Sequence, residues 1–553
     1  MNNFEKLAEL LFPNITKSPD YYEELYPQRD LPEGARVSRF SPSPTGYLHF
    51  GGLYAATAAK LNSTATNGKF YLRIEDTDKK REVEGGVSAI VDGLNYFGIT
   101  TDEGVCGESE EKGAYGPYTQ SKRVEIYQTF AKSLVLQGLA YPCFCSAEEL
   151  DEIRTAQEKE DIKGYYGKYA KCRDLSFDNI KANIESGMPW TLRLKSPGST
   201  DKKIIFDDMI KGKIEMPENV IDVVLLKTDG VPTYHFAHAV DDHLMRTTHV
   251  IRGDEWIASV PLHIQLFKVL GFKPVKYAHI APIMKEDEGG KRKLSKRKDP
   301  EAAVSYYIEQ GFPKDSVSEY IYTILNSNFE DWRRANKDAD LSSFPFNLKK
   351  MSVSGALFDM VKLLDVSKNV ISTMNAEKVF ELSYEWAKAY HPQLASLYEK
   401  NFEKATAILN IDRENKKPRK DIAKWSDIPD YISYMYDETF MPCYELNGNA
   451  TPQLACDVLE KYIDTVNFSD DKDTWFARIK QLCEPVGCTA NVKEFKQNPD
   501  AFRGHVGDVS TIIRVALIGR TNTPDLYSIT ALLGEAAVKT RLTAALNYYK
   551  EEI

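Results

Sequence analysis

The sequence contains few cysteines and no long apolar run. Eight cysteines in 553 residues are too few for a disulfide-stapled fold, and reduced thiols are typical of a cytosolic protein. No stretch of about 18 apolar residues is present, so we expect no transmembrane helix. The N-terminus lacks the basic-then-apolar arrangement of a signal peptide. We therefore expect a cytoplasmic protein that does not associate with membranes.

The sequence also lacks an excess of positive charge. Its net charge of −10 argues against indiscriminate binding of polyanions, although local basic patches suffice to neutralise phosphates. Two such patches occur, at residues 291–298 and 416–420, and either one alone is compatible with a solvated loop. With 42% hydrophobic and 27% charged residues, the composition is that of a globular protein, and the length predicts three or four domains.

The first third of the chain predicts a parallel α/β sheet. Residues 37–41 and 69–74 are typical of strands, and each precedes a helical pattern, at 52–61 and 83–97. Such strand–helix alternation is the pattern of a parallel sheet with crossover helices.

The pattern changes twice further along the chain. Residues 110–225 are less regular, which indicates an inserted module, and the α/β pattern then returns. From residue 300 helices dominate, so the last third predicts an all-helical domain. The expected strands are 220–226 and 249–252, and the expected helices are 256–270, 302–310, 316–325, 356–364, 509–517, 525–533 and 535–549.

Residues 39–52, RFSPSPTGYLHFGG, are the most informative stretch. They join a strand to a helix N-terminus, where free N–H groups and the helix dipole favour an anion. His49 can donate a hydrogen bond to a phosphate, and Gly51 and Gly52 let the backbone approach a nucleotide closely. A histidine before a glycine is more often structural, but the strand–loop–helix context favours a nucleotide site.

A cationic loop follows about 240 residues later, with Lys293 and Lys296 in KLSKR after Gly289-Gly290. Its ammonium groups suit the charge that develops on a departing pyrophosphate. The alternative is a basic loop without chemistry.

Together, SRFSPSPTGYLHFGG, YLRIEDTD, VPTYHFAHAVDDHLMRTTHVIRGDEW and KLSKRKD resemble the motifs of the glutamyl-tRNA synthetases of class I. The resemblance is close over residues 36–365 and looser over the helical tail, through VSGALFDMVKLL and the segment from RVALIGR onward. Gly52 stands where the class motif has its second histidine, which the glutamyl family commonly lacks.

The resemblance implies an α/β fold, with a Rossmann-type parallel-sheet catalytic domain, an inserted acceptor-binding module and an all-α anticodon-binding domain. The implied segments are an N-terminal extension (1–35), two halves of the catalytic domain (36–110 and 226–285), the inserted acceptor-end module (111–225), a stem-contact region with the KLSKR loop (286–370) and the anticodon-binding domain (371–553).

The resemblance also implies roles for individual residues. The residues implied to bind glutamate are Arg39, Ser41, Ser43, Glu75, Tyr234, His238 and Arg252. Those implied to bind ATP are His49, Gly51, Gly52, Glu255, Trp256 and Lys296. Those implied to be catalytic are His49, Lys293 and Lys296.

Two features bear on substrate choice. A neutral amide repays the burial of two guanidinium groups less well than a carboxylate does, which favours glutamate over glutamine. His238 departs from many bacterial members, which have asparagine there. The neighbouring Asp241, Asp242 and His243 look like a metal cluster, but we expect a structural or tRNA-end-positioning role.

Cys143, Cys145 and Cys172 lie in the expected insert, where some bacterial members bind structural zinc. Zinc requires four ligands, so the fourth would be Tyr169, Tyr166 or Tyr165, and Tyr169 is the residue we name. A metal-free loop that retains its cysteines stays open as the alternative.

The implied activity is that of a glutamate–tRNA ligase, an aminoacyl-tRNA synthetase that uses ATP with Mg²⁺. It would form glutamyl-AMP and transfer glutamate to the terminal adenosine of tRNA-Glu, as a monomer; charging of tRNA-Gln stays open. The alternatives are a glutaminyl-tRNA synthetase, a truncated paralogue that glutamylates a modified tRNA base, and a non-catalytic tRNA-binding protein.

Overall fold

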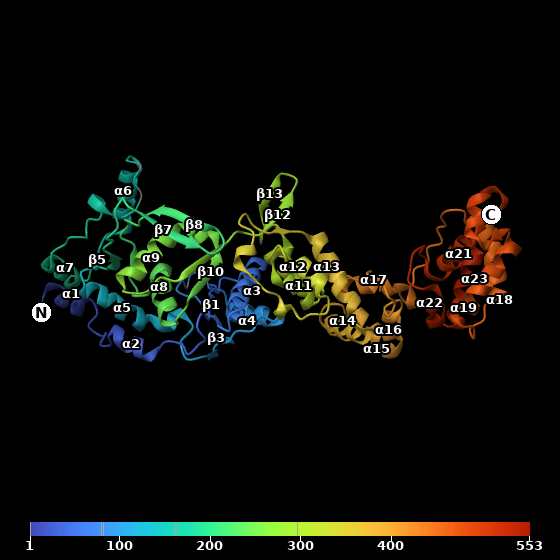
Figure 1. The fold of residues 1–553 in the computed structure, drawn as a ribbon, viewed down its shortest axis with the longest axis horizontal. Helices are drawn as coiled ribbons and strands as arrows, with labels where there is room; N and C mark the ends of the chain where they lie inside the picture. Colours follow the sequence, from blue (N-terminus) through green and yellow to red (C-terminus); the bar gives the residue numbers. More distant parts are fainter. Residues whose placement is uncertain (1, 79, 81, 161, 163, 296) are drawn as a thin grey trace. The chain divides into compact units, whose positions relative to one another are not determined.

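The computed structural model describes residues 2–78, 80, 82–160, 162, 164–295 and 297–553. The chain forms two compact units (Figure 1). Unit 1 comprises Met1–Tyr306 with Ser318–Asp359, and unit 2 comprises Tyr307–Val317 with Met360–Ile553. Among the described residues, no helix is long and apolar enough to cross a bilayer.

Unit 1 is built on a parallel sheet. The strands β1, β2 and β3 are parallel, β4 is antiparallel at one edge, and β10 pairs with β11 in parallel. The Thr248 N–H, just before β10, donates to the Val37 carbonyl of β1 over 3.0 Å, so β10 lies beside β1. The parallel order β3-β2-β1-β10-β11 is that of a Rossmann-type sheet. These strands are β1 (Val37–Phe40), β2 (Lys69–Leu72), β3 (Glu103–Val105), β4 (Glu111–Lys112), β10 (His249–Gly253) and β11 (Lys276–Ile280).

The crossover helices lie close to the positions predicted from the sequence. The alanine-rich α3 (Phe50–Thr64) packs on β1 and β2 because small side chains allow close approach, and most of its residues are buried. The helix α4 (Gly86–Tyr96) follows β2, and α8 (Tyr234–Leu244) precedes β10. The expected α/β class with a parallel sheet is confirmed.

The helix expected at 256–270 is divided. Residues Asp254–Ser259 form a 3₁₀ helix, and α9 (Val260–Val269) begins where Pro261 stands in the first turn. Proline has no N–H to donate and is favoured at that position of a helix, which explains why the regular helix starts there.

Residues between β4 and β10 form a separate layer. An antiparallel sheet joins β5, β6 and β9, and a hairpin joins β7 to β8. The elements are α5 (Val124–Leu136), β5 (Ala140–Cys143), α6 (Ala147–Glu158), α7 (Phe177–Glu185), β6 (Thr191–Leu194), β7 (Lys203–Asp208), β8 (Gly212–Pro217) and β9 (Val224–Leu226).

The strand expected at 220–226 is shorter than predicted. The buried Asp222 carboxylate accepts hydrogen bonds from the Ser196 N–H (2.8 Å), the Tyr141 hydroxyl (2.6 Å) and the Arg173 guanidinium. These side-chain bonds hold residues before Val224 as a loop in place of a strand ladder.

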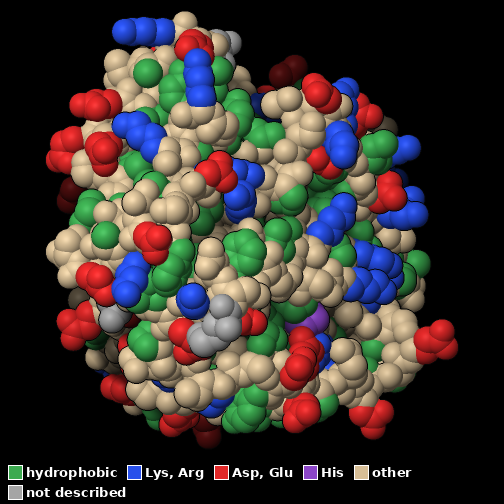
Figure 2. Space-filling view, turned by 90° about the vertical axis from the view of Figure 1, so that its left-hand side faces the viewer, with side chains coloured by type: hydrophobic (Ala, Val, Ile, Leu, Met, Phe, Trp, Pro, Cys, Tyr) green, Lys and Arg blue, Asp and Glu red, His purple; other side chains and the backbone are tan. Residues whose placement is uncertain are grey.

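The N-terminal segment packs on unit 1 through α1 (Asn3–Leu11) and α2 (Pro19–Leu25). Glu23 lies 2.8 Å from Arg246 and 2.6 Å from His243, and Arg29 lies 2.6 Å from Glu103. The face at this end of unit 1 carries acidic and basic side chains interspersed with hydrophobic ones (Figure 2). The N-terminal segment is therefore held against the rest of unit 1 by ion pairs as well as by apolar packing.

Unit 2 is mainly helical and has one extensive apolar core. The helix expected at 356–364 starts later than predicted, because Leu357–Phe358 form strand β14 beside β12 (Met284–Asp287) and the helix begins at Met360. The helices of unit 2 include α13 (Met360–Thr373), α14 (Ala376–Tyr390), α15 (Pro392–Lys400), α16 (Phe402–Asn410), α17 (Ile428–Ile432), α18 (Pro452–Thr465), α19 (Lys472–Cys483), α20 (Val492–Gln497), α21 (Val506–Ile518), α22 (Leu526–Leu533) and α23 (Glu535–Glu551).

Candidate active site

One large cavity, of about 1110 Å³, lies at the carboxyl ends of β1, β2 and β10. This edge is where open α/β sheets bind ligands. Nine of the residues singled out from the sequence line it, although they come from segments more than 200 residues apart. They are Arg39, Ser41, Ser43, His49, Gly52, Glu75, Tyr234, Arg252 and Trp256.

Two arginines, Arg39 and Arg252, face this cavity, and the carboxylate of Glu75 lies with them. Arg39 at the end of β1 has Nε 3.4 Å from Asp242, and Glu75 accepts a 3.0 Å hydrogen bond from Arg73. Burial raises the pKa of Glu75, and the nearby Arg73 and Arg39 offset this only in part. The cavity thus offers cationic groups for carboxylates and an acidic group for an ammonium.

The second arginine, Arg252, is held against aromatic rings. Its Nη1 donates to the Tyr234 hydroxyl over 3.3 Å, and the Tyr234 and Trp256 rings are 4.3 Å apart. Burial raises the pKa of Tyr234, so the phenol stays protonated at neutral pH and can both accept from Arg252 and donate to a ligand.

The loop before α3 presents polar groups to the same cavity. The Ser41 hydroxyl is buried and has no hydrogen-bond partner among the described residues. His49 caps α3, and its Nδ1 accepts the Gly52 N–H over 3.1 Å. A neutral imidazole that accepts at Nδ1 carries its hydrogen on Nε2, the form that can donate to a phosphate.

The two glycines have a packing role that the sequence did not reveal. A Cβ at Gly51 would lie 2.9 Å from His49 Cε1, and a Cβ at Gly52 would lie 3.0 Å from Leu48 Cδ1. A larger residue at either position would therefore displace the capping histidine or the leucine beneath the loop.

Several expected site residues do not line the cavity as described. His238 is fully buried one layer behind Tyr234, with its ring stacked at 5.9 Å, so it supports the pocket wall. Gly51, Glu255 and Lys293 are also outside the described lining. Lys296 lies outside the residues that the structure describes.

The basic loop is anchored by an aspartate. It follows a hairpin of β12 (Met284–Asp287) and β13 (Gly290–Lys293). The buried Asp299 accepts from both terminal nitrogens of Arg292 (2.6 and 2.7 Å) and from the Ser295 N–H (2.9 Å). The base of the loop is thus fixed on both sides of Leu294.

Asp241 and Asp242 form an ion network beneath the cavity. Both are fully buried; Asp241 lies 2.7 Å from Arg123, and Asp242 lies 2.6 Å from Arg73. Burial would raise the pKa of Asp242, but Arg73 and Arg39 hold it well below its usual range. Arginines occupy both carboxylates, which supports the structural role expected for them over a metal site. The sequence analysis gave Arg73 no role, although a charge directly after an apolar strand was a signal.

Comparison with known proteins agrees with this geometry. Residues 36–363 match the family model of class I tRNA synthetases (E and Q), catalytic domain, and residues 387–546 match an anticodon binding domain. The chain is 50% identical over 545 residues to the glutamate–tRNA ligase of Clostridium perfringens, with 98% of this chain and 100% of the relative covered. The chain belongs to the glutamate–tRNA ligase family of class I tRNA synthetases.

Further relatives support the assignment. The glutamate–tRNA ligase of Acetivibrio thermocellus is 47% identical, with 98% of this chain and 100% of the relative covered. A crystal structure of a glutamate tRNA ligase from Elizabethkingia meningosepticum, in complex with its amino acid, superposes with a TM-score of 0.75 at 27% identity. It covers 93% of this chain and 99% of that chain.

The thiols of Cys143, Cys145 and Cys172 form a compact cluster within 4.8 Å of one another. The residue beside them is Tyr165, whose hydroxyl lies 3.6 Å from Cys143 Sγ and 3.3 Å from Cys145 Sγ. The structure thus brings Tyr165 to the thiols, whereas Tyr169, the residue named from the sequence, interacts with Glu160 and Lys168.

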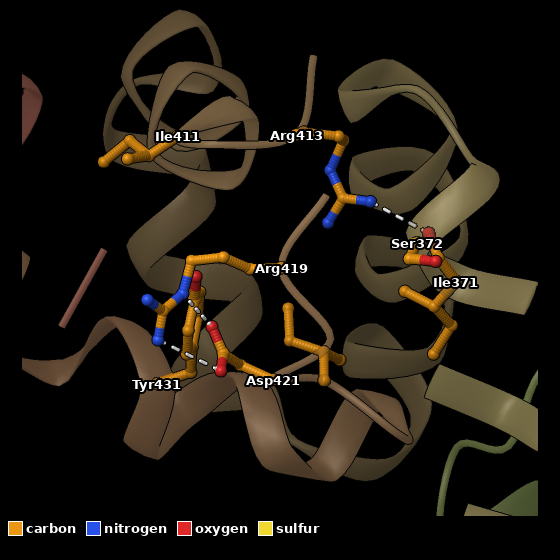
Figure 3. A pocket seen from close by; sticks show the side chains of 8 residues that line it. Ile371, Ser372, Ile411, Arg413, Arg419, Asp421 and Tyr431 are labelled. Carbon is orange, nitrogen blue, oxygen red and sulfur yellow. Dashed lines mark hydrogen bonds and ion pairs between the residues drawn. The ribbon is translucent and has the colours of Figure 1, made fainter. Parts of the chain in front are cut away.

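A small cavity in unit 2 is closed by its own side chains (Figure 3). Arg413 donates to the Ile371 carbonyl over 2.9 Å, and Arg419 pairs with Asp421 at 2.6 Å. Its volume of about 10 Å³ is too small for a ligand larger than a water molecule. Part of the basic run 416–420 therefore has a structural role.

A larger cavity of about 400 Å³ lies elsewhere in unit 2. It combines basic and aromatic side chains: Lys472, Trp475, the 39% exposed Phe476, and Arg514. The Arg514 Nε is buried without a hydrogen-bond partner among the described residues. Donors and ring faces of this kind suit an unstacked nucleobase.

Proposed function

We propose that this protein is a cytoplasmic glutamate–tRNA ligase that activates L-glutamate with ATP and esterifies it to tRNA-Glu. The observation that carries the proposal is the meeting of Arg39, Arg252 and Glu75 with the His49-capped helix in one cavity. The cationic groups match carboxylates, Glu75 matches an ammonium, and the helix N-terminus matches a phosphate.

The reaction takes two steps. A glutamate α-carboxylate oxygen attacks the α-phosphorus of ATP, and the bond to the bridging oxygen breaks, which releases pyrophosphate and leaves glutamyl-AMP. A hydroxyl of the terminal tRNA adenosine then attacks the acyl carbon, and AMP departs. Mg²⁺ accompanies ATP and offsets phosphate charge, and no protein nucleophile is required because orientation and electrostatics lower the barrier.

Residues that line the cavity are assigned to these steps by their positions, and Lys293 and Lys296 are assigned by the family resemblance. His49 Nε2–H and the N-terminal N–H groups of α3 would contact the phosphates. Lys293 and Lys296 would offset charge on pyrophosphate. Ser41, with its unpartnered buried hydroxyl, would hydrogen-bond glutamate, and Tyr234 would close the pocket above it.

Glutamate is preferred over glutamine because of the local charge. Arg39 is already opposed by Asp242 at 3.4 Å, whereas Arg252 is held by neutral groups, namely Tyr234, His263 and His279. A buried guanidinium with neutral neighbours gains more from a carboxylate than from an amide. Arg252 is thus the residue assigned to the substrate's carboxylate.

The tRNA partner would use both units. The cavity with Phe476 and Arg514 would take an unstacked anticodon base, and the exposed lysines of 416–420 would contact phosphates. The inserted layer of residues 111–225 would grip the acceptor end.

The thiol cluster fits a structural zinc ion. The three sulfurs lie within 4.8 Å of one another with the Tyr165 hydroxyl beside two of them, and zinc takes four ligands. A hydrogen bond from Cys172 lowers the pKa of Cys143 to about 4, while burial raises the pKa of Cys145 and the hydrogen bond to Cys143 raises that of Cys172, so one of the three thiols is prepared to bind as a thiolate. Cys143, Cys145, Cys172 and Tyr165 would hold the ion, which would stabilise the loop that carries them.

ATP–pyrophosphate exchange tests the proposal, with glutamate or glutamine as substrate and with or without tRNA. We expect exchange with glutamate at far lower substrate concentration than with glutamine. Preference for glutamine would establish a glutaminyl enzyme, and absence of exchange with either would favour a non-catalytic tRNA-binding protein. The helical tail and the full coverage of the ligase relatives argue against the truncated paralogue.

A further inference from the structure

A buried pair, Asp208 and His279, lies behind Arg252. The register of β10 and β11 places His279 beside Arg252, and Asp208 is the last residue of β7. Arg252 Nε is 3.1 Å from His279 Nε2, and His279 Nδ1 is 2.6 Å from Asp208 Oδ2. Both side chains are fully enclosed.

The direction of these hydrogen bonds follows from the groups involved. A guanidinium can only donate, so His279 Nε2 accepts and its Nδ1 carries the hydrogen that goes to Asp208. Burial lowers the pKa of His279, which Asp208 offsets only in part. Burial would raise the pKa of Asp208, but hydrogen bonds from His279 and from the backbone of Lys211 and Ile210 lower it. A neutral imidazole is therefore locked in one tautomer by an ionised carboxylate.

The pair determines which edge of Arg252 is left for a substrate. A guanidinium can meet a carboxylate through its Nε side or through its terminal nitrogens. His279 occupies Nε, and the Tyr277 ring, 4.7 Å from the guanidinium carbon, fixes the plane. Nη2 donates to His263 Nδ1 over 3.2 Å and lies 3.4 Å from the Trp256 carbonyl oxygen. Nη1, which donates one hydrogen to the Tyr234 hydroxyl at the cavity, keeps a second N–H for a substrate.

We propose that Asp208 and His279 are positioning residues that hold Nη1 of Arg252 toward the glutamate carboxylate. The inference rests on the proposed function, because it assigns a task to supports of the same pocket. Neither residue lines the described cavity, so both act through Arg252.

Asp208 also connects Arg252 to the inserted layer, because it is the last residue of β7. Asp208 begins the turn of the β7–β8 hairpin, where its Oδ1 accepts the N–H groups of Ile210 (3.0 Å) and Lys211 (2.8 Å). Lys211 then contacts Asp254 at 3.1 Å and the Val353 carbonyl at 3.1 Å. The orientation of Arg252 is thus coupled to a hairpin that lies outside the parallel sheet.

Steady-state exchange kinetics of His279→Phe, His279→Gln and Asp208→Asn test the pair. Loss of a hydrogen bond to a charged group predicts that His279→Phe raises KM for glutamate about tenfold or more, with KM for ATP unchanged. His279→Gln keeps an acceptor for Arg252 and restores most of the affinity. Asp208→Asn lets the imidazole adopt the other tautomer, so KM for glutamate rises again. His249→Gln, a buried histidine on β10, is the matched control and leaves both constants unchanged.

The outcomes separate this inference from the proposed function. Glutamate-dependent exchange by the unmodified protein tests the function, whereas the variants test only the pair. An unchanged KM for glutamate in His279→Phe, or equal increases for glutamate and ATP, would overturn the positioning role. If His279→Phe does not fold, Asp208→Asn and His279→Gln provide the test. The positioning role is overturned if these variants change KM for glutamate and KM for ATP equally.

Discussion

At the residue scale, the assignment of glutamate as the substrate rests mainly on Arg252. Its guanidinium is surrounded by neutral partners, so replacement by glutamine removes the charge that a substrate carboxylate would meet. We predict that Arg252→Gln lowers kcat/KM for glutamate in exchange by roughly two to three orders of magnitude. Near-normal exchange by the folded variant would contradict the pocket assignment.

Asp242 carries a stability prediction. Its carboxylate is buried between Arg73 and Arg39, and removal of one partner from such a network costs about 3 to 5 kcal/mol. Urea unfolding of Asp242→Asn at neutral pH should show a loss of that size. The exposed Asp151, paired with Arg154, is the control, and Asp151→Asn should change stability by less than about 0.5 kcal/mol.

The same residue predicts a pH dependence. The folded-state pKa of Asp242 is well below its usual value, so its stabilisation is present above the unfolded-state pKa and is lost as pH falls. The stability difference between the unmodified protein and Asp242→Asn should therefore shrink below about pH 4. A difference that is constant down to strongly acidic pH would contradict the network.

Nine of the residues that the family resemblance implied line the cavity, because their motifs lie at the carboxyl ends of strands. The sequence analysis missed their supports. Arg73 directly follows the apolar strand β2 and His279 lies within β11, and what they contact depends on which distant segment lies beside them. The family resemblance implied that His238 lies in the pocket, and a motif match does not distinguish a lining residue from one a layer behind.

At the scale of elements, the thiol loop carries a prediction on metal content. We expect the purified protein to contain one zinc ion per chain by elemental analysis and Cys145→Ser to lose it. Cys456→Ser, a buried cysteine on α18, should retain it. The zinc site would be contradicted if protein from zinc-supplemented cells contained no zinc. It would also be contradicted if Cys145→Ser and Cys456→Ser contained equal amounts of zinc.

Element boundaries were predictable where one local rule acts alone. The strands at 37–40 and 69–72 and the helices of the tail follow their apolar periodicity. The exceptions have tertiary causes: Leu357–Phe358 pair with β12, and Asp222 replaces a strand ladder with side-chain bonds. The spacing did not distinguish Tyr165 from Tyr166 or Tyr169 as the group beside the thiols, because the loop geometry that brings Tyr165 to the sulfurs is not encoded in the spacing.

At the scale of the whole molecule, the two units should have separable effects on substrates. Arg514→Ala removes a donor from the cavity in unit 2, and we predict that KM for tRNA rises about tenfold while KM for glutamate is unchanged. Charging kinetics with each substrate varied in turn measure this. The exposed Lys539→Ala is the control; an effect of Arg514→Ala on KM for glutamate alone would contradict the assignment.

Charging of purified tRNA-Glu, followed as radiolabelled amino acid esterified to the terminal adenosine, is the most direct test of the proposed activity. The arrangement of Arg39, Glu75 and Arg252 predicts ATP-dependent attachment of glutamate, with glutamine failing to compete. Attachment of glutamine in its place, or no esterified product from folded protein with ATP and Mg²⁺, would contradict the proposed function.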